Sequence, residues 1–195
     1  IVGSAEDTRE ALVSEDGAVE VDKQAFSIEP FLFVDGKLQT WAEAKTTQSL
    51  ADGFVPVPTV VRDQDGIRLS VTAAADGTHD DSLLLLQYQV TNTSSKPARG
   101  KLLLAIRPFQ VNPPYQWLNA VGGTAKVGHI AFDQSQRTIQ VDDRLVALGR
   151  EPNYFGCAAF DAGDITEFIS RDSLPPCHDV NDPQRGASAA AAYDF

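Results

Sequence analysis

A polar and aromatic segment follows directly on an apolar run in the middle of the chain. The run covers residues 102–106 and the segment, RPFQVNPPYQWLN, covers residues 107–119. Aromatic rings stack on the C–H faces of sugars, and Arg, Asn and Gln side chains can address hydroxyl groups with paired hydrogen bonds. The candidate binding residues here, for a carbohydrate or a neighbouring domain, are Arg107, Gln110, Asn112, Tyr115, Trp117 and Asn119.

A structural interpretation of this segment stays open beside the binding one. In it the rings pack a corner of the fold, Arg107 pairs with an acidic side chain, and the amides satisfy loop backbone groups. Residue types alone favour this alternative. A second aromatic loop, EPNYFG at residues 151–156, adds Tyr154 to the binding candidates, and we expect it to lie beside the first loop.

No constellation of acid, base or nucleophile is recognisable. The carboxylate pairs Asp80-Asp81 and Asp142-Asp143 are adjacent in predicted turns, and neighbouring residues of an extended chain point in opposite directions. The chain has no GxSxG elbow, P-loop or dinucleotide fingerprint, and Gly122-Gly123 opens no predicted helix. We therefore name no catalytic residue and expect no cofactor.

The histidines and cysteines do not suggest a metal site. The three histidines His79, His129 and His178 stand far apart, and His178 between Cys177 and Asp179 fits a polar loop better than a three- or four-ligand centre. A Cys157–Cys177 disulfide would close a loop of about 20 residues and contribute roughly 3 kcal/mol. A domain of this size does not need that cross-link, so free thiols are favoured.

Composition limits the partners and leaves the compartment open. With 195 residues and 43% hydrophobic side chains the chain is long enough for one large globular domain. Its net charge of −11 opposes nucleic acid and anionic membranes. No apolar run approaches the ~20 residues of a membrane span. The chain begins without a recognisable signal peptide, and a periplasmic or secreted location is favoured over a cytoplasmic one.

Short apolar stretches separated by turn signals predict an all-β antiparallel sandwich with at most one or two short helices. Residues 1–24 have no sustained period and are assigned to an N-terminal extension or leading strand. Residues 25–195 are assigned to the sandwich domain, which is expected to be a fragment of a longer chain. Strands are expected at residues 25–34, 55–61, 67–73, 83–90, 101–106, 125–132, 138–141, 145–148 and 189–195.

Several of these assignments carry positional detail. The proline-bearing stretch 55–61 is predicted to be an edge strand, and residues 41–50 form either a helix or a loop anchored by Trp41. Asp164 is expected to cap a short helix ending at Ser170. The runs 83–90 and 101–106 are predicted to be central strands covered on both faces, with burial of Leu84, Leu86, Tyr88, Leu103 and Ile106.

The segments GFVPVP, LLLLQYQVTNTSSKPARGKLLLAIRPFQVNP and EPNYFGCAAFDAGDI carry a resemblance. They resemble the N-terminal β-sandwich, a galactose-mutarotase-like supersandwich, that precedes the (α/α)6 toroid of bacterial glycoside hydrolases and phosphorylases. A closer resemblance, carried by RPFQVNPPYQWLN and EPNYFGCAAFDAGDI, is to large bacterial proteins labelled as coagulation factor 5/8 type (discoidin) domain proteins. The similarity covers roughly residues 26–195.

The resemblance implies a non-catalytic sandwich of a carbohydrate-active protein, acting in domain docking and carbohydrate contact. In such enzymes the catalytic carboxylates come from the helical toroid, so no catalytic residue is carried over. The implied partners are other domains of a longer polypeptide, a helical toroid or a discoidin-type domain, and an oligosaccharide. Two alternatives remain: a purely structural adhesion-type sandwich, and a stand-alone sugar-acting enzyme using Arg107, Asp161 or His129.

Overall fold

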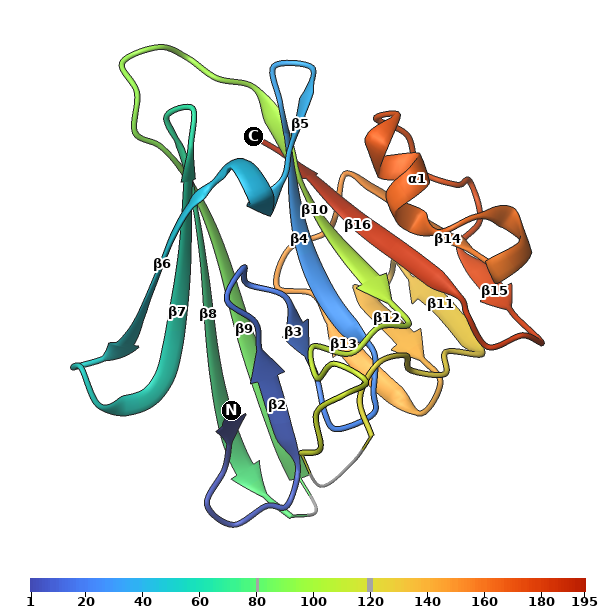
Figure 1. Ribbon diagram of the computed structural model, residues 1–195. Coiled ribbons are helices and arrows are strands. Elements are labelled where there is room, and N and C mark those ends of the chain that lie inside the picture. The colour runs from blue at the N-terminus through green and yellow to red at the C-terminus, as the bar shows by residue number, and fades with distance from the viewer. Residues whose placement is uncertain (80, 119–120) are drawn as a thin grey trace.

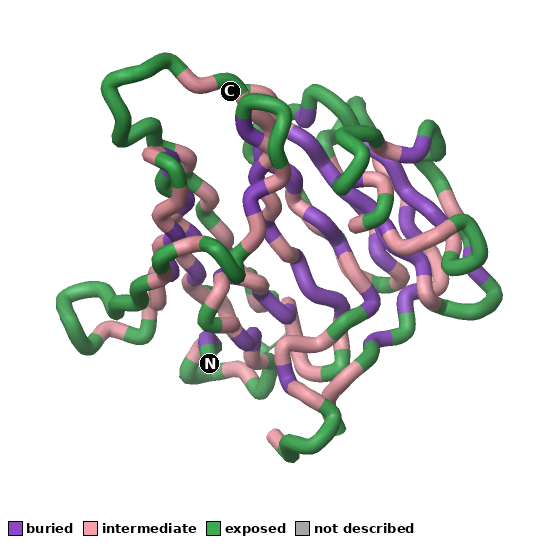
Figure 2. The backbone as a smooth tube through the Cα atoms, turned by 45° about the horizontal axis from the view of Figure 1, so that its top comes forward, coloured by how far each residue is buried: buried purple, intermediate pink, exposed green. Residues whose placement is uncertain are grey.

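Every pairing between the named strands of the described chain is antiparallel. The computed structural model describes residues 1–79, 81–118 and 121–195 (Figure 1). It is 53% strand and 6% helix, which confirms the predicted all-β sandwich class with little helix. Buried stretches follow the strands of the largest sheet, whereas the connecting loops are exposed (Figure 2).

The largest sheet has eight strands and holds both ends of the described chain. Its order is β1-β2-β3-β4-β10-β16-β14, and β5 pairs with β4. The strands are β1 (Val2–Gly3), β2 (Glu10–Val13), β3 (Val19–Glu20), β4 (Ser27–Val34), β5 (Lys37–Gln39), β10 (Gly100–Arg107), β14 (Tyr154–Ala158) and β16 (Ser188–Asp194). Residues 2–20, which lack a clear sequence period, thus contribute three short strands to it.

Two four-stranded sheets lie on one face of this large sheet. The first, in the order β6-β7-β8-β9, contains β6 (Lys45–Ala51), β7 (Val55–Gln64), β8 (Ile67–Thr78) and β9 (Asp81–Asn92). The second, in the order β13-β12-β11-β15, contains β11 (His129–Asp133), β12 (Thr138–Val141), β13 (Arg144–Ala147) and β15 (Asp179–Asn181). Figure 1 shows them on opposite sides behind β4 and β10.

Side chains that alternate along β4 show that both small sheets pack on the same face of the large sheet. Ile28 packs in one core cluster with Ile130 and Ile139 of the second small sheet. Leu32, four residues further along the same face, packs in another cluster with Leu69 of the first. Alternate residues of a strand share a face, so these two clusters divide one face of the large sheet between them.

The opposite face of the large sheet is covered by the helix α1 (Ile165–Ser170), where Ile165 and Ile169 pack on Leu103. The Asp164 carboxylate caps α1 by accepting a hydrogen bond from the Thr166 N–H at 2.9 Å, as predicted. Residues 189–192 are four consecutive buried alanines in β16. Their small side chains let the helix and neighbouring strands approach β16 closely from both faces.

The two apolar runs predicted to be central strands differ in the structure. β10 lies between β4 and β16, and Leu103 and Ile106 are buried as predicted. β9 instead ends its sheet, so the prediction for residues 83–90 was wrong. Its residues alternate between partly buried and exposed: Leu84, Leu86 and Tyr88 are only partly buried, while Leu83 and Leu85 face solvent. Because leucine occupies both faces of this edge strand, the alternation of partly buried and exposed positions is not visible in the sequence.

Two further predictions were also wrong. Over residues 59–63 β7 pairs on both sides, with β6 and β8, and is therefore interior. Pro56 and Pro58 precede this part, where no pairing with β8 is described and a register shift interrupts the pairing with β6. Residues 41–50 form a single 3-10 turn, η1 (Trp41–Glu43), and most of β6; Trp41 is exposed rather than a packing anchor.

Candidate functional site

The loop that follows β10 has a hydrogen-bonded base formed by its outgoing and returning legs. The Ala125 N–H donates to the Pro108 carbonyl at 2.9 Å, and the Gln110 N–H donates to the Gly123 carbonyl at 2.9 Å. The Gly123 N–H in turn donates to the Asn112 carbonyl at 2.8 Å. We call residues 108–118 and 121–125, the described parts of this loop, the aromatic loop.

The Gly122-Gly123 pair has a structural role that the sequence did not reveal. A Cβ atom on Gly122 would lie 2.1 Å from the Asn112 carbonyl oxygen and 2.4 Å from that of Pro113. Gly123 has a φ of +114°, a conformation that side-chain-bearing residues rarely adopt. These glycines allow the two legs of the aromatic loop to approach each other closely.

A buried carboxylate fixes the aromatic loop to the N-terminal strands. Glu20 of β3 is 1% exposed, and its Oε2 accepts a hydrogen bond from the Asn112 N–H at 3.0 Å. Its Oε1 accepts a second hydrogen bond from the Gln24 N–H at 3.1 Å. Burial raises the pKa of Glu20, and the backbone N–H donors partly oppose that rise. Sequence reasoning missed Glu20 because its contact to Asn112 joins residues far apart in the chain.

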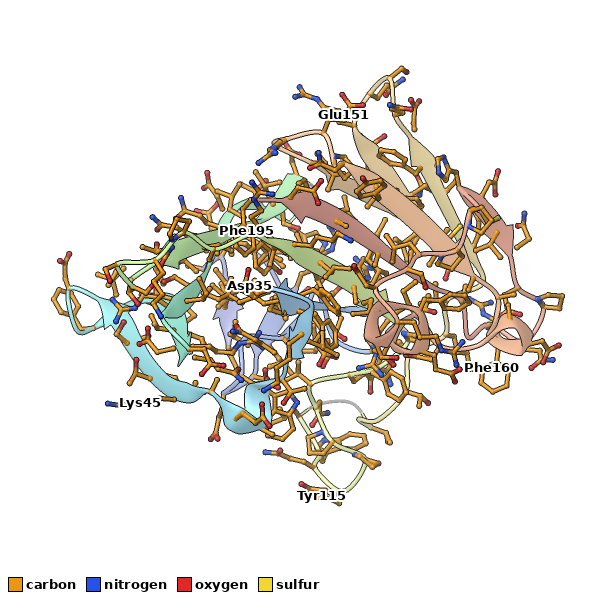
Figure 3. All side chains as sticks on the ribbon, turned by 90° about the horizontal axis from the view of Figure 1, so that it is seen from above. Asp35, Lys45, Tyr115, Glu151, Phe160 and Phe195 are labelled. Carbon is orange, nitrogen blue, oxygen red and sulfur yellow. The ribbon has the colours of Figure 1, made fainter. Side chains whose placement is uncertain are left out.

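The tip of the aromatic loop exposes two large rings. Tyr115 is 90% and Trp117 69% exposed, so both rings are accessible to solvent. Figure 3 shows Tyr115 at the edge of the molecule, away from the sheets. The backbone of Trp117 forms an isolated antiparallel bridge with Val121.

Arg107 makes its contacts inside the domain. It forms an ion pair with Glu29 of β4, lies 3.6 Å from the Asp164 carboxylate, and stacks over the Phe109 ring at 4.6 Å from the centroid. Pairing with an acidic side chain is what the structural interpretation of this residue requires. Arg107 therefore joins the base of the aromatic loop to the cap of α1.

The remaining candidate residues are placed differently from one another. Asn112 is buried, and Gln110 is partly buried, so neither is displayed beside the exposed rings. Asn119 lies outside the described residues. Tyr154 is exposed. It pairs with Ala192 of β16, which pairs in turn with Leu103 of β10, four residues before Arg107. At about 3.3 Å per residue this places the two loops about 13 Å apart along β10, so the expectation that they adjoin was wrong.

The groups considered for catalysis each interact with other neighbours. His129 Nε2 lies 3.0 Å from Asp179 Oδ1, and the exposed Asp161 carboxylate accepts a hydrogen bond from the Gln184 side chain at 2.9 Å. His178 packs edge-on against the rings of Phe132 and Phe155. In the described ranges, no three His, Cys, Asp or Glu side chains form a cluster able to hold a metal ion.

The two cysteines are free thiols, as the sequence favoured. Cys157 is buried, and its Sγ–H donates to the Cys177 carbonyl at 3.1 Å. Burial raises the pKa of the Cys157 thiol to about 12, which keeps it protonated at neutral pH. A protonated thiol in an apolar environment is a poor nucleophile.

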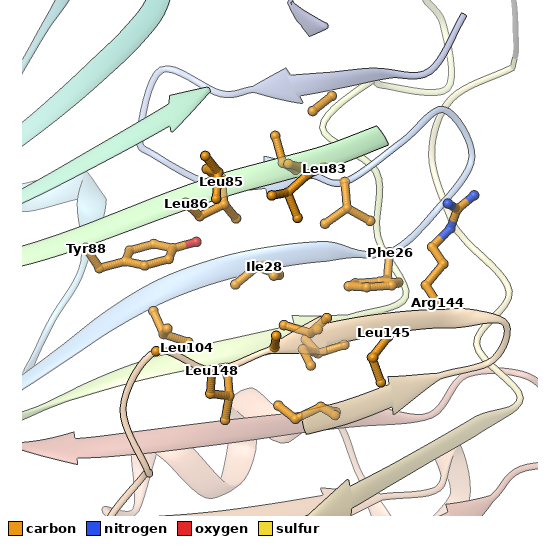
Figure 4. A pocket seen from close by; sticks show the side chains of 18 of the residues that line it. Phe26, Ile28, Leu83, Leu85, Leu86, Tyr88, Leu104, Arg144, Leu145 and Leu148 are labelled. Carbon is orange, nitrogen blue, oxygen red and sulfur yellow. The ribbon is translucent and has the colours of Figure 1, made fainter. Parts of the chain in front are cut away.

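A large apolar cleft separates the two small sheets. It has a volume of about 1080 Å³ and is lined by β9 on one side, β13 on the other, and β4 and β10 beneath (Figure 4). Tyr88 of β9 lies in it; burial raises the pKa of its hydroxyl well above the ordinary value. This cleft was not expected from the sequence, because it depends on two strands that both turned out to be edges.

No known protein family, curated protein or solved structure matches the chain. Across the described residues, no helix is both long and apolar enough to cross a membrane.

Proposed function

We propose that this chain is a non-catalytic β-sandwich domain of a bacterial carbohydrate-active protein, and that it binds through the aromatic loop. The observation that carries the proposal is the exposure of Tyr115 and Trp117 on a loop whose base is fixed by Glu20 and by paired backbone hydrogen bonds. Rings held on a fixed loop lose less conformational entropy when a ligand binds, which favours recognition.

A carbohydrate suits these rings better than an apolar ligand. Both are accessible from solvent and present flat faces, and the chain around them supplies polar groups such as Gln116. Stacking on sugar C–H faces needs no enclosed pocket. Docking of a neighbouring domain of the same polypeptide is the other use of this surface, since exposed aromatic residues are enriched in interfaces.

The contacts of the three groups considered for catalysis support the non-catalytic assignment. Arg107 is held by Glu29 and Asp164, and His129 and Asp161 interact with Asp179 and Gln184 respectively. We expect the chain to show no glycosidase, phosphorylase or epimerase turnover. Turnover on a sugar that disappears in Asp161→Asn or His129→Ala would support the stand-alone enzyme instead.

Tryptophan fluorescence offers a direct test, because the chain has two tryptophans in different places. Trp117 is on the aromatic loop, and Trp41 is 53% exposed on η1. We expect at least one oligosaccharide from a panel of α- and β-linked sugars to change the tryptophan emission. Its affinity should be millimolar, which corresponds to a binding free energy of about 4 kcal/mol. The response should persist in Trp41→Phe and disappear in Trp117→Ala.

The result that would refute carbohydrate binding is equally specific. A response that Trp117→Ala retains, or no response of the wild type to any oligosaccharide of the panel, removes the sugar role. Domain docking would then remain as the use of the exposed rings. Tyr115→Ala provides a second check, because the Tyr115 ring is the more exposed of the two. This variant should keep the stability of the wild type and bind the oligosaccharide more weakly.

A further inference from the structure

Two unpaired strand edges border the apolar cleft. β9 ends one small sheet and β13 ends the other, and within the part of the chain that the structure describes no strand pairs with their second edges. Both edge strands line the same cleft above β4 and β10 (Figure 4). An unpaired edge presents a row of backbone N–H and C=O groups that can pair with another strand.

β9 lacks the features that normally protect such an edge. It is 12 residues long, pairs with β8 without a register shift, and contains no Lys, Arg or Pro. The opposite edge of the same sheet is different. There β6 begins with Lys45 and has a register shift at Leu50/Ala51 beside the proline-bearing start of β7. Natural sheets use lysines, prolines and bulges to prevent edge pairing, so the β6 edge is protected and the β9 edge is open.

The cleft also contains apolar surface and an unsatisfied polar group. Its floor and walls include Phe26, Ile28, Leu86 and Leu104. The Tyr88 hydroxyl is buried and has no hydrogen-bond partner in the described chain. Figure 4 shows this hydroxyl pointing along the cleft. A buried hydroxyl without a partner is unfavourable, and an incoming carbonyl group could accept its hydrogen bond.

Charge selects among the possible occupants. The cleft is lined by six carboxylate residues (Asp7, Glu10, Asp22, Asp76, Asp143 and Asp194) and by three arginines (Arg9, Arg144 and Arg150). Asp22 is already paired with Arg144 at 2.9 Å and Glu10 with Lys23 at 2.8 Å, which leaves four carboxylates and two arginines. The excess of carboxylates favours a segment with basic residues. A second copy of this chain, with its own net charge of −11, is disfavoured by like-charge repulsion.

We propose that the cleft binds an extended peptide segment of a partner polypeptide, which adds to the sheet as a strand along β9. The segment would have alternating apolar side chains facing the floor and Lys or Arg residues at its ends. Backbone pairing would supply affinity, and the apolar floor would select alternate side chains, as in other strand-addition complexes. This binding is separate from that of the aromatic loop.

Synthetic peptides can test the proposal with the whole 195-residue chain. We would use a fluorescent 12-residue peptide of alternating Val and Thr with two lysines at each end. We expect saturable binding of this peptide, measured by fluorescence anisotropy. Methylating alternate backbone nitrogens of the peptide, on the edge that would pair with β9, should weaken binding at least ten-fold. A peptide of the same composition with its apolar residues blocked together should also bind at least ten-fold more weakly. Equal binding of either control peptide would overturn strand addition.

Measurements on the protein locate the binding. Amide hydrogen exchange should slow along residues 82–91 when the peptide is present, and Tyr88→Phe should weaken binding several-fold without altering the fold. The control Trp117→Ala should bind the peptide normally, because Trp117 does not line the cleft. Unchanged hydrogen exchange along β9 in the presence of peptide would overturn the proposal. It would also be overturned if the chain without peptide sedimented as a dimer and its β9 amides were already protected from exchange.

Discussion

Replacing Glu20 by Gln should loosen the aromatic loop without changing the sheet. The carboxylate accepts hydrogen bonds from the Asn112 and Gln24 N–H groups through its two oxygens. Gln has nearly the same shape but only one acceptor oxygen, so its NH2 group must face one of the two N–H donors. Leaving one of these buried N–H donors without an acceptor costs about 1–3 kcal/mol. We expect a net destabilisation of about 1–2 kcal/mol at pH 7.

The pH dependence of this effect has a defined sign. Because burial raises the pKa of Glu20 above its ordinary value of 4.5, the folded state holds this proton more tightly than the unfolded state. The contribution of Glu20 to stability is therefore fully present below the unfolded pKa and falls as pH rises toward the folded pKa. Gln does not titrate. The deficit of Glu20→Gln should accordingly be largest below pH 4.5 and become smaller as pH rises through that window.

Urea unfolding between pH 4 and 8 measures the free-energy difference, and hydrogen exchange at Asn112 and Gly123 reports on the loop. The matched control is Glu6→Gln, which alters an exposed carboxylate. We expect the Asn112 amide to exchange faster in Glu20→Gln and at the wild-type rate in the control. If Glu20→Gln were as stable as the wild type at every pH, with Asn112 equally protected, Glu20 would not be the anchor of the aromatic loop.

Three further substitutions test other parts of the fold. Leu103→Ala, beneath α1, should cost about 2–5 kcal/mol in unfolding experiments, and a loss under about 1 kcal/mol would contradict its central position. Gly122→Ala should cost roughly 1–3 kcal/mol because its Cβ would meet backbone oxygens, whereas Gly149→Ala, with open space around it, should be close to neutral. Asp164→Ala should lower stability by about 1 kcal/mol through loss of the helix cap, and Asp164→Asn should retain most of it.

Local signals in the sequence predicted the parts of the structure that depend on neighbouring residues. The cap at Asp164 was predictable because capping joins residues two apart. The position of β12 was also predictable, from a short apolar stretch between turns. The start of the aromatic loop followed from the change in residue type after Ile106.

Long-range pairing could not be predicted in the same way. A run of four leucines is compatible both with a strand covered on two faces and with an edge strand whose outer face is apolar, so β9 was misplaced. The anchoring of Asn112 by Glu20 joins residues 92 positions apart in the sequence. The separation of Tyr154 from Trp117 depends on strand order, which residue types do not encode.

The strand order of the large sheet also constrains how the chain folds. β14 reaches the sheet only through β16, and residues 108–187 intervene between β10 and β16. Joining β10 to β16 therefore pairs residues that are distant in sequence, and such long-range pairing slows folding. During N-to-C synthesis, β10 would expose one unpaired edge until residues 188–194 had emerged.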